Sequence, residues 1–73
     1  MASGEIAIRG EAIRLGQLLK LAGVIDSGSD ARGLLAEQPA LVNGEPETRR
    51  GRQLHAGDIV SVAGEELVIV GGG

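Results

Sequence analysis

Residues 15–39 read LGQLLKLAGVIDSGSDARGLLAEQP, and this stretch decides the fold because it encodes two short helices in succession. In its first part, apolar residues recur at spacings of three and four, the pattern of one buried helix face: Leu15, Leu18, Leu19 and Ala22. Gly23 stands where a left-handed residue closes a helix. The sequence therefore predicts a first helix that stops at Gly23.

A second helix is predicted to begin at Ser27-Gly28. The Ser27 hydroxyl can accept a hydrogen bond from a free backbone N–H, and Asp30 can reach back from the first turn. Pro39 ends this helix, because the residue before a proline is pushed out of helical space. Its apolar stripe is Ala31, Leu34 and Leu35. Only four residues, 24–27, join the two helices, so we expect the pair to pack together.

Extended segments flank the helix pair. Residues 5–9 (EIAIR) alternate apolar and polar, as in a strand with one buried face. Asn43-Gly44 is typical of a type I′ hairpin turn, and Pro46 makes the returning strand an edge strand. Later turns predict strands at residues 59–62 and 67–70. The fold class is α+β, with two short packed helices on a small, mainly antiparallel sheet of four to five strands, the first and last able to pair.

Length and composition predict one domain over residues 1–73, with residues 71–73 as a flexible tail. A chain of 73 residues is enough for a single core, and without cysteine its stability must come from packing. The first residues lack the pattern of a signal peptide, and no apolar run reaches the ~20 residues that span a bilayer. We expect a cytoplasmic monomer that does not bind membranes.

The charge balance limits how this chain could bind a nucleic acid. Seven basic against ten acidic residues give a net charge of −3, and there is no Phe, Trp or Tyr. A dedicated nucleic-acid binder usually carries a positive excess, and single-strand binders stack bases on aromatic rings. RNA binding would therefore depend on phosphate contacts, hydrogen bonds and shape.

The arginines after the hairpin are the main functional signal. Arg49, Arg50 and Arg52 lie within four residues, and guanidinium groups can hold phosphate oxygens with two hydrogen bonds. Lys20 on the first helix and Arg32 near the start of the second could share a surface with them. The alternative is a solvated loop whose arginines pair with Glu45 and Glu47.

Catalytic and metal chemistry have no support in the sequence. His55 is the only histidine, and we interpret it as a turn residue near the arginines. No Ser-His-Asp order, phosphate loop or pair of catalytic carboxylates is present. We expect a protein that is not an enzyme, with no catalytic residue, no metal and no cofactor.

Taken in order, several short segments resemble the S-four (S4) RNA-binding domain, named after a small-subunit ribosomal protein. The resemblance covers residues 13–64 and is greatest to the compact stand-alone bacterial members of the YbcJ type. It rests on the following segments: Leu18–Gly23, Ser27-Gly28, Ala31-Arg32, Val42–Glu45, Glu47–Arg50 and Gly57-Asp58. Membership would imply a helix pair of the alpha-L type packed on a small sheet. It would also imply structured RNA, often ribosomal, bound across the helices and hairpin.

The resemblance also implies a set of RNA-binding positions. With Arg52 added from the arginine cluster, the candidate site is Arg14, Lys20, Ser27, Gly28, Arg32, Asn43, Gly44, Arg49, Arg50 and Arg52. Many members of the family carry arginine where Gly28 stands and a basic residue where Glu45 stands. Each missing cation removes a potential phosphate contact, so these differences concern affinity more than fold.

Two other functions are compatible with parts of the sequence. The end Gly71-Gly72-Gly73 resembles the diglycine terminus of β-grasp sulfur carriers and protein modifiers, although that fold needs a hairpin before one main helix. The second alternative is a protein-interaction module on the same fold that binds a partner through an edge strand.

Overall fold

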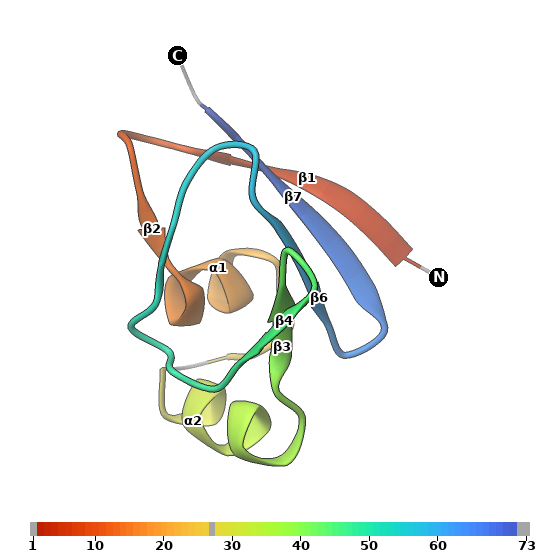
Figure 1. Cartoon of the computed structure of the whole chain (residues 1–73). Coiled ribbons are helices and arrows are strands. Elements are labelled where there is room, and N and C mark those ends of the chain that lie inside the picture. Colours follow the sequence, from red (N-terminus) through yellow and green to blue (C-terminus); the bar gives the residue numbers. More distant parts are fainter. Residues whose placement is uncertain (1, 27, 72–73) are drawn as a thin grey trace.

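The computed structural model describes the backbone of residues 2–26 and 28–71 (Figure 1). The predicted helix cap Ser27 lies outside the described residues, and the Asp30 side chain is outside them too. The elements in chain order are β1 Ala2–Ile8, β2 Ile13–Arg14, α1 Leu15–Leu21, α2 Gly28–Glu37, β3 Ala40–Val42, β4 Glu45–Glu47, β5 Gln53–Leu54, β6 Ile59–Val62 and β7 Glu65–Gly71.

Five strands form the main sheet, in the order β1-β7-β6-β3-β4. The first and last strands do pair, in parallel, with Ile6 opposite Ile69. The other neighbours in this sheet are antiparallel, which confirms the predicted architecture. β4 lies at an edge, as Pro46 predicted, because proline cannot donate to a second neighbour. The other edge is β1.

A second, two-stranded sheet was not predicted. β2 pairs with β5, with Ile13 opposite Leu54 and Arg14 opposite Gln53. Strands of two residues carry no measurable periodicity in sequence. This small sheet matters for the site. Its strand β2 directly precedes α1, and its strand β5 directly follows the arginine-rich segment.

Both helices end where the sequence predicts. Gly23 has φ +77°, and the Val24 N–H donates to the Leu19 carbonyl at 3.0 Å, the pattern of a glycine-closed helix. α2 ends at Glu37, two residues before Pro39. Asn43 and Gly44 have φ +53° and +88°, as a type I′ turn requires.

One cluster of buried side chains joins the helices to the inner face of the main sheet. Figure 1 shows both helices on one side of strands β6 and β7. Fully buried members include Leu15, Leu18 and Leu19 from α1, Leu35 from α2, and Val60 and Ile69 from the sheet. Burial of these apolar side chains fixes the positions of α1 and α2 on the sheet, and therefore the backbone positions of the cations that the helices carry.

The order of elements does not match the β-grasp alternative. That fold needs a hairpin before its main helix, whereas here β1 pairs with β7 and β2 pairs with β5. Two helices then follow before the first hairpin of the main sheet, β3–β4. The carrier interpretation is therefore not supported, and Gly72 and Gly73 lie outside the described residues.

Candidate nucleic-acid interface

The first N–H groups of α1 are capped by backbone carbonyls of the arginine-rich loop, while Gln17 Oε1 accepts from the N–H of the N-cap residue Arg14 at 3.4 Å. Arg14 occupies the N-cap position, but a guanidinium has only donors and cannot accept from the helix N–H groups. Instead, the Leu15 N–H donates to the Arg52 carbonyl at 2.9 Å, and the Gly16 N–H donates to the Arg50 carbonyl at 2.8 Å. The loop 48–52 is thereby fixed against the first turn of α1.

Gly16 is the point where this loop meets both helices. A Cβ built on Gly16 would lie 3.3 Å from Arg50 Cβ, 3.4 Å from the Arg50 carbonyl oxygen and 3.9 Å from Ala31 Cβ. Ala31 belongs to α2 and directly precedes Arg32. The absence of a side chain at Gly16 thus allows α1, α2 and the loop to approach closely.

Four segments, β2, α1, α2 and the loop, each carry a cation close in sequence to this contact. Arg14 lies two residues before Gly16, Lys20 lies one turn after it on the same side of α1, and Arg32 follows Ala31 on α2. All three side chains are exposed, as is Arg50 on the loop. We call these four residues, Arg14, Lys20, Arg32 and Arg50, the basic junction.

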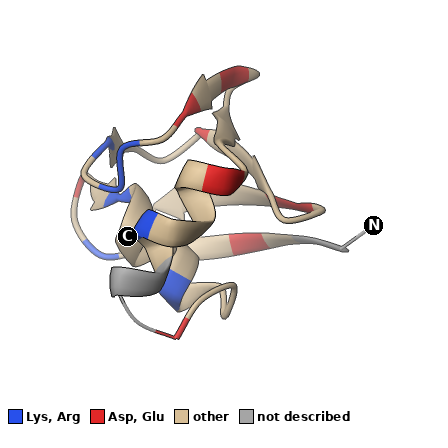
Figure 2. Cartoon of the chain, turned by 90° about the horizontal axis from the view of Figure 1, so that it is seen from below, with Lys and Arg blue, Asp and Glu red and all other residues tan. Residues whose placement is uncertain are grey.

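Figure 2 shows how charge is distributed over the chain as a whole. The basic segments of the ribbon gather toward the left of this view, whereas most acidic segments lie further to the right. Basic and acidic residues are therefore unevenly distributed over the backbone, although the net charge is −3. A local positive field can attract an anion despite a negative total.

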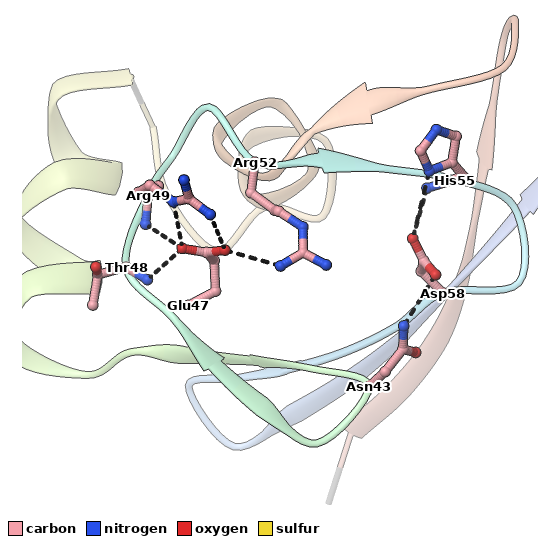
Figure 3. Close-up of polar contacts among 7 residues, drawn as sticks. All are labelled: Asn43, Glu47, Thr48, Arg49, Arg52, His55 and Asp58. Carbon is pink, nitrogen blue, oxygen red and sulfur yellow. Dashed lines mark hydrogen bonds and ion pairs between the residues drawn. The ribbon is translucent and has the colours of Figure 1, made fainter.

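Glu47 at the end of β4 organises the arginine-rich loop (Figure 3). Its side chain is only 8% exposed. The carboxylate accepts hydrogen bonds from the backbone N–H groups of Thr48 and Arg49, both at 3.1 Å. It also accepts from Arg49 Nε at 3.1 Å and from Arg52 Nη1 at 2.9 Å.

These hydrogen bonds favour the ionised form of Glu47. Side-chain hydrogen bonds from Arg49, followed by the Arg49 backbone N–H and the Arg52 side chain, lower the pKa of Glu47 to about 2, against the opposing effect of burial. The same pair raises the pKa of Arg49. Glu47 is thus a carboxylate throughout the neutral range, and it holds two guanidinium groups in place.

The pairing with acidic neighbours, which the alternative interpretation of the loop required, is present for two of the arginines. Arg49 and Arg52 pair with Glu47. Each guanidinium has five N–H donors, so the contacts with Glu47 occupy only part of either group. Arg49 remains 76% exposed and Arg52 38% exposed at the side chain. Sequence reasoning named Glu47 as a possible partner but missed its burial, which depends on tertiary packing.

The hairpin tip lies apart from the basic junction. Asn43-Gly44 is at one end of β4, and Glu47 is at the other. The Asn43 side chain donates through Nδ2 to Asp58 Oδ1 at 3.1 Å and accepts from the Ile59 N–H at 2.9 Å. These contacts join the turn to the start of β6 (Figure 3). The sequence predicted Asn43 as a turn residue, but not that its side chain would join the turn to β6.

Asp58 completes this second polar cluster. It accepts from the His55 backbone N–H at 2.8 Å, and this bond, with the Asn43 side chain, lowers the pKa of Asp58. His55 itself is exposed, and its Nδ1 lies 4.0 Å from Asp58 Oδ2, which fits the predicted turn residue. Among the described residues, no group of three or more His, Asp or Glu side chains could hold a metal ion.

The remaining predicted positions lie at the start of α2. Gly28 is the first residue of that helix, and Ser27 is outside the described part of the chain. Within residues 2–26 and 28–71, neither helix has the length and apolar character needed to cross a membrane.

Comparison with known proteins identifies the family to which this chain belongs. The family described as the S4 domain matches residues 6–70, so the chain belongs to the S4 domain family. The chain is 54% identical over 59 residues to "Probable ribosome maturation protein RlbA" of Bacillus subtilis (strain 168), covering 81% of this chain and 83% of the relative. It is 40% identical over 58 residues to "Putative RNA-binding protein YbcJ" of Escherichia coli (strain K12), covering 80% and 83%. The resemblance to YbcJ-type proteins is confirmed.

Proposed function

We propose that this chain binds structured RNA without catalysis, and that ribosomal RNA is its target class. The observation that carries the proposal is the contact at Gly16, where the Arg50 loop and the first turn of α2 meet α1. The names of the two relatives, one for RNA binding and one for ribosome maturation, support the choice of ligand.

The basic junction fits a folded RNA better than a free single strand. Its cations come from β2, both helices and a loop, so tertiary packing sets the positions of the backbone segments that carry them. Guanidinium and ammonium groups carried at set backbone positions would match phosphates held at fixed positions by RNA structure. Without aromatic side chains, the chain cannot use the stacking platforms of single-strand binders.

The uneven distribution of charge indicates which side of the protein would face the RNA. Phosphates would approach the side that carries the arginines, and the acidic residues elsewhere would repel RNA from the other surfaces. We propose a monomer that acts in the cytoplasm, where ribosomes are assembled. Arg14, Lys20, Arg32, Arg49, Arg50 and Arg52 are the proposed phosphate-binding residues.

The contacts of each cation decide which variant gives the cleanest test. Arg49 is bonded to Glu47, so removing it would also disturb the loop. Lys20 and Arg32 are exposed and, among the described residues, form no ion pair. We therefore choose the double variant Lys20→Ala/Arg32→Ala and measure its binding to structured ribosomal RNA fragments over a range of salt concentrations.

The double variant should bind about tenfold more weakly at low salt, since two phosphate contacts of roughly 0.7 kcal/mol each are lost. The negative slope of log affinity against log salt should become shallower by about 1.5. Glu66→Gln is the control, because it changes the net charge by one unit on an exposed residue of β7. Equal binding by the wild type and the double variant would contradict the proposal.

A protein-interaction module predicts a different outcome. Its partner would bind an edge of the sheet, β1 or β4, and would stay bound after RNase treatment. RNA-dependent partners would be released by the same treatment, so a pull-down with and without RNase separates the two functions.

A further inference from the structure

A groove runs along the side of α1 that adjoins the basic junction. Gln17, Lys20 and Leu21 lie three and four residues apart, so they share one face of the helix. This face forms one wall of the groove. The end of β1, the connection to β2 and the first residue of β2 line the rest, with Ala7, Ile8, Arg9, Ala12 and Ile13. The volume is about 850 Å³.

The lining combines positive charge with apolar surface. Arg9 and Lys20 supply two cations, and no acidic side chain is among the lining residues. Leu21 is 63% exposed, the most exposed of the large hydrophobic side chains that the structure describes. A single exposed leucine is ordinary, but here it lies in a concave site with two cations and a carboxamide.

This combination matches the chemistry of one nucleotide. A phosphate needs cationic donors, and a base presents apolar faces. The Gln17 Oε1 accepts from the Arg14 N–H at 3.4 Å, so its Nε2 is the group that can donate to the polar edge of a base. The volume lies within the range of small-molecule sites. Because the protein has no aromatic residue, an unstacked base would have to rest on aliphatic surface.

The groove is also placed to receive RNA bound at the basic junction. Lys20 belongs to both, and Gln17 directly follows Gly16, which contacts the Arg50 loop. Ile13 lines the groove, and the next residue, Arg14, pairs with Gln53 beside Arg52. RNA held at the junction would therefore reach the groove without leaving the surface of α1.

We propose that this groove holds one unstacked nucleotide of the bound RNA, with Leu21 against the base and Arg9 and Lys20 against its phosphates. The proposal rests on the proposed function and adds a preference to it. The chain would favour RNA with a bulged or looped-out nucleotide over a continuous helix of the same length.

Three RNA hairpins of otherwise identical sequence test this preference. One has no bulge, one has a single bulged nucleotide, and one has an abasic residue at the bulge. The wild-type protein should bind the bulged hairpin about fivefold more tightly than the other two, because only this hairpin offers a base to the groove. The abasic hairpin controls for the flexibility and backbone shape that a bulge introduces.

Two variants assign the effect to the groove. Leu21→Ser should remove the preference for the bulged hairpin while leaving the affinity for the continuous hairpin unchanged. Leu41→Ser is the matched control, because Leu41 is exposed to 41% on β3 and does not line the groove. Arg9→Ala should reduce the preference in the same way as Leu21→Ser.

The possible outcomes separate the two proposals. If the protein binds all three hairpins equally, the groove proposal is wrong and the proposed function stands. If Leu21→Ser keeps the full preference, the base is held elsewhere, and the groove proposal is again wrong. If the wild type binds none of the hairpins, both proposals fail.

Discussion

The backbone N–H of Gly16 donates to the carbonyl of Arg50 at 2.8 Å, and this bond connects the first helix to the arginine-rich loop. The two residues are so close that a Cβ on Gly16 would lie 3.3 Å from Arg50 Cβ. Segments that are distant in the sequence and that carry cations thereby meet at one contact. The basic junction depends on a residue that carries no charge.

We expect Gly16→Ala to stabilise the protein less than Gly33→Ala. Both glycines lie in helices, where alanine is favoured by about 0.5–1 kcal/mol. A Cβ at Gly33 meets nothing within 4 Å, so that variant should show the full gain. At Gly16 the new methyl group crowds Arg50 and offsets the gain. Urea unfolding of both variants checks this, and equal stabilisation would show that the loop moves aside freely.

Glu47→Gln should weaken RNA binding although it makes the net charge less negative. The carboxylate holds Arg49 and Arg52, and a neutral amide cannot accept the same set of hydrogen bonds. The exposed Glu45 on the same strand provides the control, Glu45→Gln. If Glu47 only neutralised the arginines, its replacement would tighten binding. Titration of both variants with the same RNA fragment distinguishes the two effects.

Stability should fall in acid because of Glu47. Its pKa is about 2 in the folded protein, against 4.5 for an ordinary glutamate. A lowered pKa contributes stability that is complete above about pH 5 and is lost as the pH falls toward 2. Asp58, whose pKa is also lowered, acts in the same direction. Glu47→Gln should flatten the loss of stability in this window, as measured by urea unfolding at several pH values.

Asn43→Ala should destabilise the fold by about 1–2 kcal/mol, because it removes two hydrogen bonds and places alanine at φ +53°. Asn43→Gly should cost less, since glycine accepts a positive φ. If the role of Asn43 is structural, the affinity of either folded variant for RNA should match the wild type. A large loss of affinity without loss of stability would instead indicate an RNA contact at the hairpin tip.

Local patterns were enough to predict the main elements. The helix ends at Gly23 and before Pro39, the Asn43-Gly44 turn and the edge position of Pro46 each follow from the backbone preferences of one or two residues. The β2–β5 pair was not predictable, because two residues per strand leave no period to detect. The burial of Glu47 was missed for a related reason: no local pattern distinguishes it from the exposed Glu45.

The sequence by itself determined the helices, the turns, the main strands and the number of cations, because these depend on the preferences of neighbouring residues. Only the tertiary structure decided which of the segments that carry cations lie next to one another. Packing of α1 against the sheet and α2 placed Gly16 under the Arg50 loop, and burial of Glu47 fixed two guanidiniums beside it. These contacts join residues up to thirty-four positions apart, such as Gly16 and Arg50, and their geometry arises from the shared core instead of from any local pattern.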